Sequence, residues 1–303
     1  MLTRFSHAGI TWVDLESPTH AEAMLVMEEF RLDRFIAEEL LFPTVKPRLE
    51  RHSHYLYIVL HFPTTRHTHK TKDQEVDFVV GRDFIITTRY DIVDPLHLFS
   101  RVFEVNSHTD KASLGDHPGF IFYYMMKRMY KATEHEHVVV RGALDEIEQQ
   151  IFSGHERAMV TALSGAGRDL VDLRQAVEPH RDILHELERE GSLFFGDAFA
   201  PFLRGLTNEN HRVYSHITRL TETLRELRET NNSLLTAKQN DIMKTLTIMA
   251  FATLPLSLIA TLFGMNTAHT PLVGHAYDFW AVIAIMGVAA VCMFAYFRSQ
   301  KWW

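Results

Sequence analysis

The stretch Thr261–Pro271, TLFGMNTAHTP, places polar groups at the end of a strongly apolar run. Gly264-Met265-Asn266 either stops a helix there or does chemistry at the mouth of a membrane pore. The side-chain amide of Asn266 is the group with chemical potential in this triplet, because its oxygen accepts hydrogen bonds while carrying no charge. What it can do depends on the elements that hold it.

Histidine is the second group that could do chemistry, with 19 in the chain. Three His-x-His pairs occur: His52/His54, His67/His69 and His135/His137. On a strand, His52 and His54 would point the same way and could hold a soft divalent ion such as zinc. The alternative is solvated histidines on loops and strand faces, since no third ligand at clear spacing accompanies any pair.

Composition excludes several classes of protein. No HExxH, GxSxG or P-loop motif is present, which argues against a hydrolase, and we expect no enzyme activity and no cofactor. The single cysteine, Cys292, rules out an intrachain disulfide, a Cys-based zinc site and a thiol pair. The net charge of −7 argues against a nucleic-acid partner and suits an environment that attracts cations.

Two uncharged runs near the C-terminus, Thr245–Phe263 and Phe279–Phe297, have 19 residues each. As helices, both are long enough to cross a hydrocarbon core of roughly 30 Å. Two buried core helices are the alternative, but such runs at one end of a polar chain favour membrane spans. The lipid bilayer is therefore an expected partner.

The basic residues predict the orientation of these spans. Lys238 and Lys244 precede the first run, Arg298 and Lys301 follow the second, and the loop 264–278 has no Lys or Arg. By the positive-inside rule the loop faces out and both termini are cytoplasmic, in a multi-pass protein of the cell (inner) membrane. The N-terminus has no apolar signal core, so the first span must direct insertion.

The first 115 residues or so indicate a mixed α/β domain. Runs rich in β-branched and aromatic residues predict strands at Gly9–Leu15, His54–Phe62, Val76–Val80 and Asp83–Thr88. Apolar residues at helical spacing after Ser17-Pro18 predict one helix, and a second helix is expected over Pro95–Val105. Strands and helices in alternation then predict a sheet covered by helices.

From Pro118 the pattern is helical. Long helices are predicted over Phe120–Phe152 and His155–Glu190, the second bent near Gly165–Gly167 and Pro179. The sequence EGSLFFGD is the expected turn that follows. From Phe199 to Phe263 no turn cluster interrupts the pattern, which predicts a rod of roughly 95 Å that runs from cytoplasm into bilayer.

A heptad stripe lies on this rod and indicates a narrow helix–helix seam. Its positions are Val213, Ile217, Leu220, Leu224, Leu227, Asn231 and Leu234. By itself the stripe fits the edge of an intramolecular core equally well. The continuity of the rod favours a coiled coil between identical stalks, because such a rod needs partners along most of its length.

The segment Asn240–Asn266, NDIMKTLTIMAFATLPLSLIATLFGMN, closely resembles the first transmembrane segment of CorA-type divalent-cation transporters. It shares the MK-LTI start, the mid-helix proline and the terminal GMN. The second span, the mixed N-terminal domain and DLRQAVEPHRDILHEL also fit, so the resemblance covers the whole chain. It implies a funnel-shaped homopentamer with five long helices around one axial pore and an outer ring of second spans.

One face of the first span suits such a pore, because it is smaller and more polar than the face carrying Ile248, Phe251 and Ile259. The positions on it are Asn240, Met243, Thr247, Ala250, Leu254, Ser257 and Thr261. Small residues on a membrane helix alone are more typical of packing surfaces. Given the resemblance, we expect pore lining, with apolar constrictions at Met243, Leu246 and Leu254 and a polar inner ring at Asn240.

The resemblance assigns the selectivity filter to Gly264, Met265 and Asn266. Mg²⁺ gives up its inner waters reluctantly, so a ring of Asn266 amides would select the hydrated ion by hydrogen bonds to its waters. Gly264 suits the left-handed residue that ends the helix. Mg²⁺ is thus the expected cargo, with Co²⁺ or Ni²⁺, in passive gated uptake.

The outer loop departs from magnesium-type members, since it has no Glu and only Asp278 as an acid. This leaves open the ZntB-like zinc branch, with possible proton coupling, and a membrane-tethered coiled-coil scaffold is a second alternative.

Regulatory Mg²⁺ is also expected in the family, but Gly205 stands where an acid is often found. The cluster Asp145, Glu146 and Glu148 could substitute, or form a solvated acidic helix face.

The expected organisation has six parts. They are a cytoplasmic α/β domain (1–115), a cytoplasmic helical hairpin (116–195), a stalk helix continuing into the first span (196–264), an outer loop (265–278), the second span (279–297) and a basic cytoplasmic tail (298–303).

Overall fold

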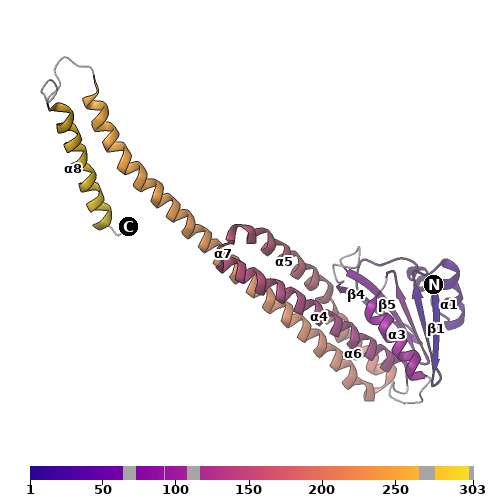
Figure 1. Cartoon of the computed structure of the whole chain (residues 1–303). Helices are drawn as coiled ribbons and strands as arrows, with labels where there is room; N and C mark the ends of the chain where they lie inside the picture. Colours follow the sequence, from indigo (N-terminus) through magenta and orange to yellow (C-terminus); the bar gives the residue numbers. More distant parts are fainter. Residues whose placement is uncertain (64–72, 92, 108–116, 266–276, 300–303) are drawn as a thin grey trace. The chain divides into compact units, whose positions relative to one another are not determined.

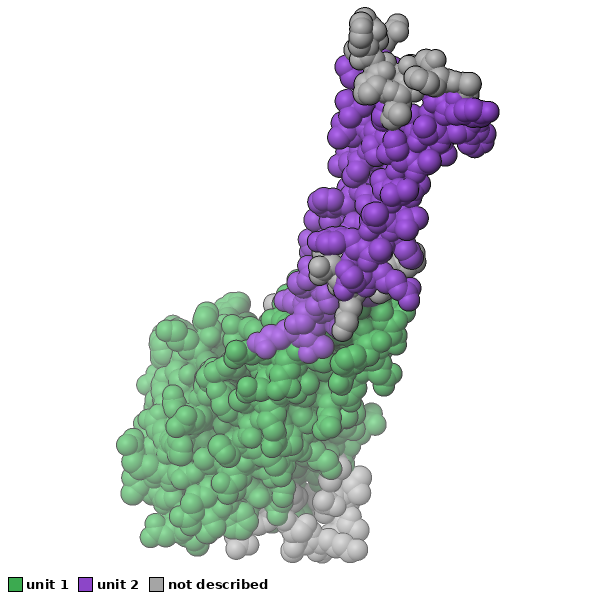
Figure 2. Space-filling view, turned by 90° about the vertical axis from the view of Figure 1, so that its left-hand side faces the viewer, with its two compact units in different colours: residues 1–228 green, residues 229–303 purple. Residues whose placement is uncertain are grey.

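The computed structural model of the chain describes residues 1–63, 73–91, 93–107, 117–265 and 277–299. It divides into two compact units, Met1–Arg228 and Glu229–Trp303, which Figure 2 colours separately. The first unit holds a sheet and a helical bundle. The second holds the end of one long helix and the helix that follows it.

Six strands form one sheet in the order β1-β2-β6-β5-β4-β3. Their bounds are β1 Leu2–His7, β2 Ile10–Glu16, β3 Arg48–Arg51, β4 Tyr55–Pro63, β5 Asp73–Gly81 and β6 Phe84–Arg89. Strands β2 and β6 pair in parallel, and every other neighbouring pair is antiparallel. The predicted strands at β2, β4, β5 and β6 are confirmed, whereas β1 and β3 were missed.

Helices α1 (His20–Phe30) and α2 (Arg34–Glu39) cover one face of the sheet. Thr19 caps α1, and its side chain and that of Glu22 form a reciprocal capping box. Apolar side chains of both helices, such as Val26 and Ile36, join the core formed by alternate strand residues. The burial of this face follows from the period-2 alternation of the strands.

Helices α3 (Asp94–Ser107) and α4 (Pro118–Phe152) lie over the other face (Figure 1). The Trp12 ring packs edge-on against Phe103 with centroids 5.4 Å apart, and Phe78 packs against Phe122 at 5.1 Å. Aromatic contacts of this geometry add to the apolar burial that holds α3 and α4 to the sheet. The prediction of a helix-covered sheet is confirmed.

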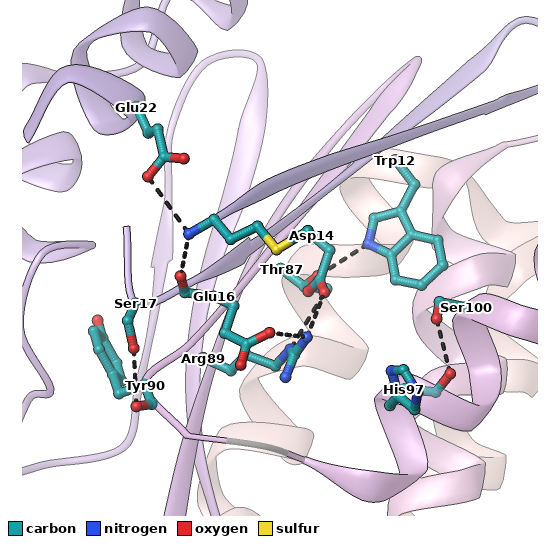
Figure 3. A network of polar contacts seen from close by, with 11 residues as sticks. Trp12, Asp14, Glu16, Ser17, Glu22, Thr87, Arg89, Tyr90, His97 and Ser100 are labelled. Carbon is teal, nitrogen blue, oxygen red and sulfur yellow. Dashed lines mark hydrogen bonds and ion pairs between the residues drawn. The ribbon is translucent and has the colours of Figure 1, made fainter. Parts of the chain in front are cut away.

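A polar network ties the parallel strands β2 and β6 together (Figure 3). The Trp12 indole donates to Thr87 Oγ1 at 2.9 Å, and Thr87 donates to Asp14 Oδ1 at 2.7 Å. Arg89 then bridges Asp14 and Glu16, with Nη2–oxygen distances of 3.0 Å to each. These buried polar groups therefore satisfy one another.

The helical part of the first unit contains α4, α5 (Glu156–Val177), α6 (His180–Phe195) and the start of α7 (Ala200–Phe263). Helix α5 is continuous across Gly165–Gly167, and the expected bend there stays a prediction. The break falls at Pro179, as predicted. The turn is also shorter than expected, because α6 continues to Phe195 and the chain turns at Gly196, whose φ is +94°.

Six of the seven residues of the heptad stripe are buried inside the chain itself, and Leu234 is half-buried. Val213, Ile217 and Leu220 are 1%, 1% and 6% exposed within the bundle. Hydrogen bonds between α7 and its neighbours flank them, from Asn210 Nδ2 to Val177 O and from Arg228 Nη2 to Leu163 O, both 3.2 Å. The expectation of a coiled coil between stalks is therefore wrong for Val213, Ile217 and Leu220, because packing within one chain already buries them.

Candidate ion pathway

Two helices of the second unit are long and apolar enough to cross a membrane: the final part of α7, and α8 (Asp278–Ser299). Helix α7 continues without interruption through Pro255 to Phe263. Both predicted spans therefore form helices, and α8 extends one residue before and two beyond its predicted range.

One stripe of α7 is partly covered. Ile248, Ala252, Pro255 and Ile259 are half-buried, while most of their neighbours along the helix are exposed. Their three- and four-residue spacing puts them on a single face. Helix α8 has a matching half-buried stripe, consisting of Val282, Met286, Ala289, Met293 and Phe297. The matching periodicity of the two stripes indicates that the spans turn these faces toward each other within the second unit.

The predicted pore-lining positions lie roughly opposite this α8-facing stripe, at 100° of rotation per residue. Seven of the eight are exposed: Asn240, Met243, Leu246, Ala250, Leu254, Ser257 and Thr261. Thr247 is half-buried. Helix α8 leaves the opposite face of α7 open, and that face carries no ionisable side chain at the eight positions.

The two threonines of this face have their hydroxyl protons engaged. Thr247 Oγ1 donates to Met243 O at 2.8 Å, and Thr261 Oγ1 donates to Leu258 O at 3.0 Å. A hydroxyl that donates to its own helix keeps its lone pairs as acceptors. Both side chains can therefore accept hydrogen bonds from water, as a hydrated cation requires.

The helix ends at the filter triplet. Gly264 N still donates to Ala260 O at 3.0 Å, and Met265 N donates to Leu262 O at 3.4 Å, which tightens the last turn. The expectation of a left-handed Gly264 is wrong, because among the described glycines only Gly9, Gly154 and Gly196 have positive φ. Asn266 and most of the outer loop lie outside the described residues, and Met265 is exposed.

Pro255 lies in the stripe that faces α8. A proline inside a helix leaves the carbonyl four residues earlier without its donor, and a lipid-facing helix must satisfy that carbonyl elsewhere. The half-buried position of Pro255 in this stripe fits packing on a neighbouring helix.

The acidic cluster Asp145, Glu146 and Glu148 is exposed on α4. Within the described part of the chain, no group of three or more His, Cys, Asp or Glu side chains is arranged to hold a metal ion. The three acids therefore form a solvated face within one chain. Gly205, which stands where an acid was considered, lies beside Tyr123.

The side chains of the His52/His54 pair do not converge. His52 and His54 lie in the turn before β4, and not on a strand. The His52 ring stacks on Tyr55 at 4.4 Å, whereas His54 Nε2 lies 3.0 Å from Arg31 O. His67 and His69 lie outside the described residues.

A different histidine pair forms between helices. His137 of α4 lies against His216 of α7, with ring centroids 4.6 Å apart. Sequence spacing could not reveal it, because two separate helices bring these residues together. The only available signal was that His137 belongs to the His135/His137 pair.

A soluble α/β unit, a helical bundle and a long helix that continues into the first of two apolar spans define a membrane protein with an open polar helix face. The chain matches the family model for the CorA-like Mg²⁺ transporter protein over residues 7–299, and it belongs to that family. It is a divalent-cation transporter of the membrane, and its family consists of transporters and channels, not enzymes.

Relatives match nearly the whole chain. The cobalt/magnesium transport protein CorA of Thermotoga maritima is 24% identical, over 96% of this chain and 83% of its own. The complete structure of the CorA magnesium transporter from Methanocaldococcus jannaschii aligns with a TM-score of 0.85 and 19% identity, over 97% of this chain and 92% of that one.

The zinc branch is more distant. The ZntB cytoplasmic domain from Vibrio parahaemolyticus aligns with a TM-score of 0.63 and 9% identity, over 77% of this chain and 90% of that domain. At this identity the likeness extends to the fold alone.

Proposed function

We propose that this chain forms a homopentameric, passive and gated pathway for hydrated Mg²⁺, which also admits Co²⁺ and Ni²⁺. Five α7 helices would line the axis, and Asn266 of each copy would complete a GMN filter at the outer end. Uptake would run toward the cytoplasm down the membrane potential, which is worth about 2.3 kcal/mol per charge at 100 mV.

The position of the open α7 face opposite α8 carries this proposal. A single helix cannot enclose a pore, and α8 covers only one side of α7. In a closed ring of identical copies, the open face would turn to the axis and α8 would lie outside it. Packing against other helices is the alternative for a small-residue face, but the polar side chains of this face and the predicted asparagine rings favour contact with water.

The chemistry of this face favours a hydrated divalent ion. Neutral acceptors at Asn240, Thr247, Thr261 and Asn266 can bind the ion's waters without holding the ion as tightly as a carboxylate ring would. Conduction needs such weak binding, since the ion must also leave. Mg²⁺ loses its inner waters reluctantly, so recognition of the hydrated ion avoids that cost.

Localisation follows from charge. Lys238 and Lys244 precede the first span, Arg298 and Lys301 follow the second, and the loop 264–278 has no Lys or Arg; by the positive-inside rule this supports cytoplasmic termini and a filter on the outer side. We assign the chain to the cell inner membrane as a multi-pass protein.

The test is Mg²⁺ uptake by an uptake-deficient host that expresses Asn266→Ala. We expect uptake to be lost while the purified variant still assembles as a pentamer. Asn232→Ala, the same substitution at an exposed α7 position before the span, is the matched control and should transport normally. Normal Mg²⁺ uptake by Asn266→Ala would contradict the filter assignment.

Ion identity needs a separate experiment, because the acid-poor outer loop also suits zinc. Purified protein in proteoliposomes should carry Mg²⁺ in preference to Zn²⁺, with a flux that does not depend on a pH gradient. A Zn²⁺ flux that exceeds the Mg²⁺ flux and follows the gradient would favour proton-coupled zinc transport. No flux of either ion would favour a scaffold.

A regulatory role for Asp145, Glu146 and Glu148 stays a prediction. Because these acids do not form a metal site within one chain's described residues, a bound regulatory Mg²⁺ would need ligands from a second copy.

A further inference from the structure

A cavity of about 330 Å³ lies between α4 and α7, within the first unit. It is lined by His137, Arg141, Leu144 and Asp145 of α4 and by His216, Arg219, Leu220 and Thr223 of α7. A cavity of this size is at the small end of the range for small-molecule sites. The ion pathway uses none of these eight residues.

The charge around the cavity is predominantly basic. Arg141 and Arg219 line it from opposite helices, and Asp145 is the single acid in the lining. Neither arginine forms an ion pair with any residue that the structure describes, unlike Arg212, which pairs with Glu134 at 2.8 Å. Two guanidinium groups therefore retain unused donors at one opening.

The histidines add donors between the arginines. The rings of His137 and His216 lie 4.6 Å apart, and Nδ1 of His216 is enclosed without a hydrogen-bond partner in the described structure. Burial, followed by the proximity of His216, lowers the pKa of His137. Both effects disfavour the protonated, positively charged form of His137, and a bound anion would offset them.

A transition-metal ion is the alternative occupant, because neutral imidazoles bind zinc, nickel and copper. The two arginines oppose it, since they place positive charge at the same opening. A zinc site also needs three or four protein ligands, and the described residues offer no such group. Arginine, in contrast, matches the geometry of phosphate oxygens.

We propose that the cavity between α4 and α7 binds a phosphate-type oxyanion, held by Arg141 and Arg219 together with His216. Leu144 and Leu220 would pack against the less polar part of the ligand. A volume of about 330 Å³ has room for one or two phosphoryl groups, as in pyrophosphate or the phosphate end of a nucleotide. This site is independent of the identity of the transported ion.

The site would link two helices of the bundle. His216, Arg219 and Thr223 belong to α7, the helix that also carries the open face of the first span. An anion that bridges α4 and α7 would bind more tightly when the two helices are packed together than when they are apart. Binding would therefore favour the packed arrangement. Binding is nevertheless measurable without transport.

The test is calorimetric titration of the purified full-length protein with inorganic pyrophosphate, in buffer containing EDTA and no phosphate. We expect saturable binding. Arg219→Ala should weaken it about tenfold or more, because a charge-assisted contact is lost. Arg225→Ala is the matched control: it removes the same charge from α7 outside the cavity and should leave the affinity within about twofold. Arg141→Ala, on α4, repeats the test if Arg219→Ala does not fold.

Two results would overturn the proposal. One is the absence of saturable pyrophosphate binding to the wild-type chain, or an equal loss in Arg219→Ala and Arg225→Ala, which would indicate diffuse surface charge. The other is tight Zn²⁺ binding, lost in His216→Gln, without pyrophosphate binding, which would make the cavity a metal site.

Discussion

The guanidinium of Arg89 donates two hydrogen bonds to one oxygen of Asp14, at 3.2 Å from Nε and 3.0 Å from Nη2. The two side chains are only 6% and 10% exposed, and they lie on the parallel strands β2 and β6 (Figure 3). This pair joins two neighbouring strands that are far apart in the sequence, since 75 positions separate Arg89 from Asp14. Its loss would leave a buried charge without a partner.

We therefore expect Arg89→Met to lower the free energy of unfolding by about 3–5 kcal/mol, the usual cost of breaking a buried pair from one side. Arg4→Met is the matched control, because the Arg4–Glu29 pair on neighbouring β1 is 42% and 37% exposed. It should cost no more than about 1 kcal/mol. Denaturant unfolding of the full chain in detergent measures both, and equal losses would contradict a special role for the buried pair.

Asp77 gives the protein a distinct pH dependence. It is fully buried on β5, and Tyr90 Oη donates to its Oδ2 at 3.0 Å. Burial first, and then the charge of Glu75, raise the pKa of Asp77 well above its ordinary 3.8. A raised folded-state pKa means that its contribution to stability is present at low pH and is lost as pH rises through that raised value.

Asp77→Asn should remove this loss. The Asn amide can donate toward Glu75 as the protonated acid does, and it needs no proton from solvent. We expect the variant to match or exceed the wild type in melting temperature at pH 8, with a smaller advantage at pH 5. Asp77→Ala, which removes the acceptor of Tyr90, should be less stable at both. A wild type that gains stability relative to Asp77→Asn as pH rises would contradict the raised pKa.

His180 has the opposite dependence. It is completely buried where α6 begins, with Nδ1 3.0 Å from Tyr130 Oη and Nε2 2.9 Å from His61 O. Burial lowers its pKa from 6.5 to about 3. The unfolded chain therefore binds a proton that the folded chain excludes, and stability falls as pH drops from 6.5 toward 3.

We expect His180→Gln to be less stable than the wild type at pH 7, with a difference that shrinks by up to about 1.4 kcal/mol per pH unit below pH 6.5. Tyr130→Phe, which removes one hydrogen bond and leaves the imidazole in place, is the comparison. Its cost of about 1 kcal/mol should stay nearly constant over the same range. Parallel pH curves for wild type and His180→Gln would indicate an ordinary histidine.

How much of the fold the sequence predicts depends on burial. Strands β2, β4, β5 and β6 were predictable because they lie inside the sheet and consist of long apolar runs. The edge strands β1 and β3 have alternating or charged sequences, LTRFSH and RLER, which resemble loops. The heptad stripe of α7 was visible, but periodicity cannot say whether the partner helix belongs to the same chain.

Glycines illustrate a second limit. Gly167 suggested a bend in α5, yet a Cβ there would lie 2.3 Å from Nη2 of Arg228, so the glycine makes room for a side chain of α7. Only the tertiary fold reveals this role. The site has the same limit: spacing predicted the open face of the first span, whereas its position opposite α8 required the structure.

The open face also makes a prediction about gating. Leu254 is exposed on the face opposite α8, where a ring of five leucines would form an apolar constriction that shuts the pore by dewetting. Leu254→Ser should therefore raise the Mg²⁺ flux into proteoliposomes several-fold, because a polar ring stays wet.

Leu262→Ser is the matched control for this gate. Leu262 is also exposed on α7, but it lies about 100° around the helix from the centre of the open face. The same polar substitution there should leave flux near the wild-type level. If Leu262→Ser raised flux as much as Leu254→Ser, the effect would come from a loosened span, and the assignment of the open face to the pore would be wrong.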